Sequence, residues 1–226
     1  MISRNRFFFL SLTSLAYVLL SPVVFFLVKD TLHLMLAWNM ALGYLPFLFA
    51  YILQKKKMQK PLMAVLLGLW LLFFPNSLYI LTDFIYVDAA GFIRAELYQP
   101  LVYLRGFLAY LGLFHILFGA LIGVALGLSS FESVRINHFS KWNFKPKWLL
   151  TALVFLLSSL AIYIGRFLRF NSWDILNIFS IVKQFFKGID LFTLFFILFF
   201  FALHWLLYGL AFLFVDHDHS LETFSG

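Results

Sequence analysis

The chain has 226 residues, of which 63% are hydrophobic and only 12% are charged. A soluble domain of this size is about half apolar and about a quarter charged, so the composition excludes a water-soluble globule and predicts that lipid surrounds most of the chain. The 32 phenylalanines are therefore expected mainly to face acyl chains, not to form an aromatic cofactor site. The absence of cysteine excludes disulfides, thiolate metal sites and a cysteine nucleophile.

The net charge of +7 comes from Lys and Arg residues that lie mainly in short segments between apolar runs. This distribution is typical of cytoplasmic loops in contact with anionic headgroups, so we expect membrane lipids as partners and no nucleic acid. The N-terminus and the loops around Lys55 and Lys145 together carry ten Lys and Arg residues, against seven in the other three loops, and four of these seven follow the fifth span. The bias predicts that both termini lie in the cytoplasm.

The apolar runs predict an all-α fold, an integral membrane helical bundle of about six transmembrane helices in a single domain over residues 1–226. The expected spans cover residues 7–28, 31–53, 61–82, 103–128, 148–167 and 191–215. Polar residues then recur at helical spacing after Ser172, which predicts one interfacial amphipathic helix over residues 172–187. Residues 129–147 are expected to form a basic loop. The residues after 83 are expected to form a mixed loop, for which a partly re-entrant course stays open. Residues 216–219 are expected to form a solvated end.

The third span ends in a polar stretch, Pro75 to Asp83. On a helix, Asn76, Tyr79 and Asp83 fall at i, i+3 and i+7 and share one face. Polar groups at this depth need a protein or water partner, because hydrocarbon offers none. The stretch is therefore expected to form one wall of a polar site or of a salt-bridged contact.

The fourth span carries Gly119, Gly123 and Gly127 at four-residue spacing, with His115 one step earlier on the same face. Small residues at this spacing let helix backbones approach closely, so His115 is expected to face the bundle interior. His204 is the second intramembrane histidine, and His33 is expected at the interface. Neither His115 nor His204 has a carboxylate or a second His at i+3 or i+4, so no metal site is predicted. A hydrogen-bonded role within the bundle is favoured, with proton relay and metal or haem ligation as the alternatives.

The fifth span ends in a second polar stretch, Gly165 to Asp174. Asn171 is expected to cap the interfacial helix, with Asp174 at its third position. The third and fifth spans run in the same direction, so both polar stretches are expected on one membrane face, the extracytoplasmic one.

Together the two stretches resemble the signatures of a bacterial multi-pass membrane family known as domain of unknown function 1361. The resembling segments read Pro75-Asn76-Ser77-Leu78-Tyr79-Ile80-Leu81-Thr82-Asp83 and Gly165-Arg166-Phe167-Leu168-Arg169-Phe170-Asn171-Ser172-Trp173-Asp174. The resemblance implies a protein of the bacterial cytoplasmic (inner) membrane and carries no established activity.

Two chemical interpretations of these residues stay open. Asp83 and Asp174 are candidate catalytic acid/base groups, and Arg166 with Arg169 could hold a phosphate or carboxylate. The other candidate ligand-binding residues are Asn76, Tyr79, Thr82, Asn171 and Trp173. In the alternative, the two carboxylates pair with the two arginines and merely lock the segments, while the aromatic residues anchor the interface.

Three functions are compatible with these patterns. The first is binding or processing of an anionic lipid or cell-envelope compound at the extracytoplasmic face. The second is a small-solute or proton-coupled transporter in which Asn76, His115 and His204 line a path. The third is a structural or assembly protein without a ligand. No serine-hydrolase elbow or phosphate-binding glycine loop is present, and no cofactor, substrate or oligomeric state is indicated.

Overall fold

The computed structural model describes the chain except for residues 56–57, 88–92, 95–101, 104–105, 140–143 and 223–226. Among the described residues, six helices are long and apolar enough to cross a membrane. This confirms the predicted helical membrane class. The chain divides into two compact units, Met1–Ser130 and Phe131–Gly226, and each is described by itself.

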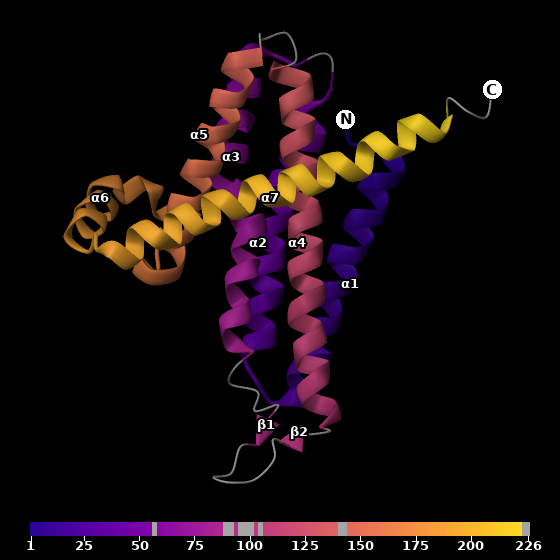
Figure 1. Cartoon of the computed structure of the whole chain (residues 1–226), viewed down its shortest axis with the longest axis vertical. Coiled ribbons are helices and arrows are strands. Elements are labelled where there is room, and N and C mark those ends of the chain that lie inside the picture. Colours follow the sequence, from indigo (N-terminus) through magenta and orange to yellow (C-terminus); the bar gives the residue numbers. More distant parts are fainter. Residues whose placement is uncertain (56–57, 88–92, 95–101, 104–105, 140–143, 223–226) are drawn as a thin grey trace. The chain divides into compact units, whose positions relative to one another are not determined.

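Four helices run side by side in the first unit (Figure 1): α1 (Arg4–Val28), α2 (Leu32–Leu53), α3 (Lys60–Tyr79) and the first part of α4 (Phe107–Phe139). The 3-10 helix η1 (Ile80–Tyr86) continues α3, and two short antiparallel strands, β1 (Ile93–Arg94) and β2 (Val102–Tyr103), follow it. The third span was predicted to end at residue 82, but helical backbone reaches Tyr86, with tighter winding from Ile80 onward.

Hydrogen bonds between α1 and α2 hold the end of the unit at which α1 begins. The backbone N–H of Ile2 donates to Oε1 of Gln54 at 3.1 Å, and Nε2 of Gln54 donates to the carbonyl of Ile2 at 3.0 Å. Farther along, the hydroxyls of Ser11 and Tyr44 lie 2.7 Å apart. These bonds fix the register of the first two helices.

The backbone around Ser77 of α3 is enclosed by glycines from two neighbouring helices. A Cβ atom on Gly43 of α2 would lie 3.2 Å from Cα of Ser77, and one on Gly123 of α4 would lie 2.5 Å from its carbonyl oxygen. A Cβ on Gly127 would lie 2.7 Å from Oγ of Ser77. Close approach by the glycines of the fourth span is therefore confirmed, and it is centred on the first polar stretch.

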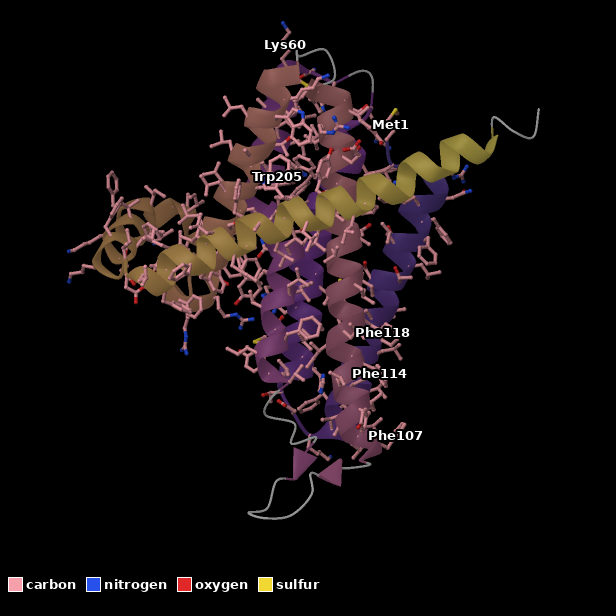
Figure 2. All side chains as sticks on the ribbon, in the orientation of Figure 1. Met1, Lys60, Phe107, Phe114, Phe118 and Trp205 are labelled. Carbon is pink, nitrogen blue, oxygen red and sulfur yellow. The ribbon has the colours of Figure 1, made fainter. Side chains whose placement is uncertain are left out.

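Large apolar side chains cover the outside of the first unit. Phe107, Phe114 and Phe118 point outward from α4 (Figure 2) and are 76%, 49% and 57% exposed. Phe8, Phe9 and Phe26 of α1 are also exposed. Such a surface is unfavourable in water and suited to acyl chains, as expected from the phenylalanine content.

The second unit consists of the end of α4 and the elements that follow it. These are α5 (Phe144–Tyr163), the π-helical turn η3 (Ile164–Leu168), the 3-10 helix η4 (Ser172–Asn177), α6 (Ile178–Lys187) and α7 (Leu191–Glu222). Helices α5 and α7 pack together. At their junction the Asp190 carboxylate caps α7 by accepting from the backbone N–H of Thr193 at 2.8 Å, and the hydroxyl of Thr193 lies 2.8 Å from that of Tyr163.

The expected fourth span and the basic loop after it differ from the structure. Helix α4 starts at Phe107, not at residue 103, and it continues to Phe139 instead of ending at residue 128. The polar residues of this segment form bonds within the helix: Oγ of Ser130 donates to the carbonyl of Gly127 at 2.9 Å, and Nδ2 of Asn137 donates to that of Ser133 at 2.7 Å. The polar residues of this segment, which indicated a loop, are therefore part of a helix.

The remaining bounds lie close to the expected ones. Residues 172–187 are helical as predicted, with a 3-10 first turn. The backbone of α7 extends to Glu222, beyond the expected end at residue 215. The side chains of residues 216–219 and most of the segment between residues 88 and 105 lie outside the described part, so the solvated end and the re-entrant loop stay predictions.

Candidate functional site

A buried carboxylate closes the first polar stretch. Asp83 lies in η1 and is 0% exposed, and its Oδ2 accepts a hydrogen bond from Nδ2 of Asn39 in α2 at 3.0 Å. Asn39 lies about 10 Å along α2 by helix rise. A carboxylate removed from solvent requires such donors, because burial of an unpaired charge is costly. Asp83 is thus buried within the first unit, and its expected position at a membrane face stays a prediction.

Two buried histidines from different helices contact each other in the same unit as Asp83. Nδ1 of His33, at the start of α2, lies 3.1 Å from Nδ1 of His115, about 12 Å along α4. The rings are nearly perpendicular, with centroids 4.9 Å apart. His33 is 2% exposed and His115 is 7% exposed. The inward position of His115 is confirmed. His33 is also buried, against Gly112 of α4, while the interfacial depth expected for it stays a prediction.

Helix α1 completes the surroundings of His115. The ring of Tyr17 stacks on that of His115 at a centroid distance of 4.4 Å, and Nε2 of His115 lies 3.0 Å from Oγ of Ser21. Ser21 is fully buried, and its hydroxyl donates to the carbonyl of Tyr17 at 2.8 Å. We call His33, His115, Tyr17 and Ser21 the histidine cluster.

Two carboxylates interact with different members of the histidine cluster. Asp83 lies close enough to the Tyr17 hydroxyl to interact with it electrostatically, and Asp30 interacts in the same way with His33. Asp30 lies in the exposed turn between α1 and α2, where its Oδ1 accepts from the backbone N–H of Leu32 at 2.9 Å. Charged and titratable groups thus extend from the surface of the unit into its interior.

The other candidates of the first stretch form hydrogen bonds within their own helix. Nδ2 of Asn76 donates to the carbonyl of Phe73 at 3.1 Å, and Oγ1 of Thr82 donates to that of Tyr79 at 2.6 Å. Asn76, Tyr79 and Thr82 are half-buried. A ligand role for the three residues stays a prediction.

The second polar stretch has an unusual backbone. Residues Ile164–Leu168 form a π-helical turn, and Arg169 follows it with φ of 59°. The left-handed region is uncommon for residues other than glycine, and π turns are rare and frequent at functional sites. Arg169 is exposed and Arg166 is half-buried. Arg169 thus ends a membrane span in the left-handed conformation, as Lys29 does at the end of α1.

Asn171 and Asp174 form the expected cap of the next helix. The backbone N–H of Asn171 donates to Oδ2 of Asp174 at 2.7 Å, and the Asn171 side chain accepts from the third residue's backbone, so the two make a capping box. The predicted cap is confirmed. Trp173, between them, is 46% exposed, which suits an interfacial anchor.

The amphipathic helix that follows exposes a large apolar surface. Leu176, Phe179 and Phe186 are 90%, 89% and 70% exposed. Lys183 and Lys187 lie on the same helix. This combination of exposed apolar residues and lysines is typical of a helix that lies in the headgroup region of a membrane.

His204 has a different environment from the histidine cluster. Its Nδ1 lies 2.6 Å from the carbonyl of Phe200 and therefore carries the hydrogen, so its Nε2 accepts from the hydroxyl of Ser158 on α5 at 2.9 Å. Both ring nitrogens are satisfied within the second unit. His204 is thus hydrogen-bonded within its unit, as favoured from the sequence. A position of His204 on a transport path stays a prediction.

The structure describes Asp83 and the two arginines within different units. Asp83 belongs to the first unit, and Arg166, Arg169 and Asp174 belong to the second. Their meeting on one membrane face therefore stays a prediction. Within the described residues, no cluster of three or more His, Cys, Asp or Glu side chains could hold a metal ion.

The family of the chain follows from residues 38–207, which match the model of Protein of unknown function (DUF1361). The chain belongs to this family. The DUF1361 match includes Asn39, Asp83, His115 and both polar stretches, whereas Tyr17, Ser21 and His33 precede it. No curated protein and no solved structure matches the chain significantly.

Sequence reasoning missed three partners in this DUF1361 protein. These are Asn39 for Asp83, His33 for His115 and Ser158 for His204. Each of the three is a polar residue inside an otherwise apolar span, and this was the signal in the sequence that could have identified them. Their pairing depends on the rotation of each helix about its axis, which spacing within one span does not define.

Proposed function

We propose that this protein binds an anionic lipid or an anionic cell-envelope compound at the extracytoplasmic face of a bacterial cytoplasmic membrane, with both termini in the cytoplasm. The observation that carries the proposal is the backbone of Arg169, which stands at positive φ, exposed, at the end of a π turn and immediately before a capped interfacial helix. The distribution of Lys and Arg along the chain supports the orientation.

Arg166 and Arg169 are the proposed clamp for the anion. A guanidinium group forms paired, charge-assisted hydrogen bonds with phosphate or carboxylate oxygens. The exposed apolar residues of α6 would insert between acyl chains beside such a headgroup, and Trp173 would anchor the segment at the interface. The combination favours a lipid-like ligand over a small soluble anion.

Processing of the bound compound would require an acid or base. Asp174 is the carboxyl group of the same segment, and its Oδ2 already accepts the backbone N–H of Asn171. The other carboxylate oxygen would carry the chemistry. Asp83 is the other carboxyl group that we propose as an acid or base.

Lipid retention measured by native mass spectrometry tests the clamp. Arg166→Ala and Arg169→Gly should lose co-purifying anionic lipid, and Arg169→Gly should do so without loss of stability, because glycine adopts positive φ freely. Lys29→Gly is the matched control, because Lys29 is also exposed and ends a helix with φ of 64°. Unchanged anionic lipid in both arginine variants would contradict the clamp and favour a purely structural role.

A small-solute or proton-coupled carrier is the second candidate function, and the hydrogen bond between His33 and His115 favours it. A polar group that is buried in a membrane span is expensive and usually belongs to an ion or substrate pathway. Reconstituted flux that is indifferent to His115→Asn and Asn76→Ala would exclude this function.

A further inference from the structure

We propose that His33 and His115 form a proton-binding site, in which the proton enters at Nε2 of His33 and its charge is shared with His115. The inference deepens the proposed carrier function, because it names the transported ion and the atoms that bind the ion. It rests on the carrier function only for the biological use of the site. It is independent of the proposed arginine clamp, which lies in the other unit.

The tautomer of His115 follows from its contact with Ser21. The hydroxyl hydrogen of Ser21 is donated to the carbonyl of Tyr17 at 2.8 Å, so the hydroxyl oxygen faces Nε2 of His115 as an acceptor at 3.0 Å. Nε2 of His115 therefore carries a hydrogen. In a neutral imidazole the other nitrogen, Nδ1, then carries a lone pair, which faces Nδ1 of His33 at 3.1 Å and the Tyr17 hydroxyl at 3.4 Å.

The tautomer of His33 follows from that of His115. Two nitrogen lone pairs would repel each other at 3.1 Å, so Nδ1 of His33 carries the hydrogen and donates it to Nδ1 of His115. Nε2 of neutral His33 then has a free lone pair. Among the residues that the structure describes, no hydrogen-bond partner meets this nitrogen, which lies against Gly112 at a position where a Cβ would be 3.4 Å away.

The open nitrogen is the entry point for a proton. A proton from water binds the lone pair of His33 Nε2 and makes His33 an imidazolium. The hydrogen on His33 Nδ1 can then pass to His115 Nδ1, which leaves His33 neutral and makes His115 the imidazolium. One N–H bond forms and one breaks in this transfer, and the charge moves from α2 to α4.

The groups around the pair suit a positive charge. Asp30 faces His33 from the α1–α2 turn, and Asp83 faces Tyr17 from η1, while Tyr17 itself stacks on His115 from α1. An imidazolium under an aromatic face gains cation–π attraction. The negative charge of Asp30 beside His33 offsets part of the desolvation that disfavours a buried cation.

His204 provides an internal control for the assignment. It is as buried as His33, at 2% exposed, yet its Nδ1 donates to a carbonyl and its Nε2 accepts from the Ser158 hydroxyl. Protonation of His204 would break the bond from Ser158. The open lone pair, not burial, therefore distinguishes His33.

The test is solid-state NMR of the full chain in lipid nanodiscs with 15N-labelled histidine. We expect hydrogen on Nδ1 of His33, on Nε2 of His115 and on Nδ1 of His204 at about pH 8, and gain of a hydrogen on Nε2 of His33 as the pH is lowered. His33→Asn should abolish this gain while its amide still donates to His115, which keeps the fold. His204→Asn should leave the gain unchanged.

Three results would overturn the proposal: the opposite tautomers at His33 and His115, protonation of His204 before His33, or a tetrahedral Co2+ absorption band that His33→Asn removes and His204→Asn does not. The last would assign the pair to a transition metal. Because these readouts need no transport, a protein that binds the proton but shows no flux would exclude the carrier function alone.

Discussion

Gly123 of α4 lies directly against the carbonyl of Ser77 in α3, so that a Cβ on the glycine would stand 2.5 Å from the carbonyl oxygen. The same Ser77 is approached from α2 by Gly43. The polar stretch that begins at Pro75 is thus the segment at which α2, α3 and α4 approach closely. In a membrane, where lipid is as apolar as the helices, such approach is a main source of association.

Gly123→Ala should destabilise the first unit. The added methyl overlaps the Ser77 carbonyl and the side chain of Ile80, at 2.5 Å and 3.0 Å, so the helices must separate at a cost of about 1–3 kcal/mol. Gly68→Ala is the matched control, because a Cβ there meets nothing within 4 Å. It should be neutral or stabilising by up to about 1 kcal/mol. Thermal unfolding in detergent compares the two, and equal effects would contradict close packing at Gly123.

Asp83→Ala should destabilise more than Asp83→Asn. Alanine leaves the half-buried amide of Asn39 without the charged acceptor that it has at 3.0 Å, which costs about 1–3 kcal/mol. The asparagine variant keeps an oxygen in reach of the same donor. Chemical unfolding of both variants measures the difference. A larger loss in Asp83→Asn would mean that the charge itself, rather than the hydrogen bond, stabilises the unit.

Asp190 should make the second unit sensitive to acid. The backbone N–H of Thr193, and then its hydroxyl, hold the pKa of the Asp190 carboxyl below its usual value. A lowered folded-state pKa contributes stability that is present above the unfolded-state pKa, about 3.9, and is lost as the pH falls through the folded-state value. Unfolding of wild type and Asp190→Asn across this range should show a steeper acid loss in wild type. Parallel curves would contradict the cap.

Tyr208→Phe should weaken the contact between α7 and the end of α4. The Tyr208 hydroxyl donates to Oε2 of Glu132 at 3.2 Å, while Arg135 holds the same carboxylate with two bonds at 2.6 Å and 2.7 Å. Loss of one such bond costs about 0.5–1.5 kcal/mol. Unfolding of Glu132→Gln and of the double variant completes a cycle. Additive effects of the two substitutions would show that the hydroxyl and the carboxylate are not coupled.

The sequence predicted well those features that lie within one segment. The six spans, the interfacial helix, the Asn171–Asp174 cap and the inward glycine face all depend on spacing along a single helix. Such patterns are local, and hydrocarbon leaves helix as the conformation that satisfies the backbone. The length of α4 was misjudged because serine and asparagine can bond to their own helix as well as to a loop.

Contacts between segments were harder to predict. The spans are apolar on all sides, so composition does not indicate which face of a helix meets its neighbour. His33 shows the difficulty: two residues into α2 it reads as interfacial, and only the position of α4 makes it a partner of His115. Asn39 was missed for the same reason, since nothing in its own span identifies Asp83 as its acceptor.

The π turn at Ile164–Leu168 also has a consequence for how the chain tolerates changes in length. A π turn holds one residue more than the α-helical turn that it replaces. Deletion of one residue there would restore an ordinary turn and leave the segment after it in place. The same deletion in the middle of α5 would rotate everything downstream by about 100°. The end of the fifth span is thus the point in this helix where a one-residue difference in length is best absorbed.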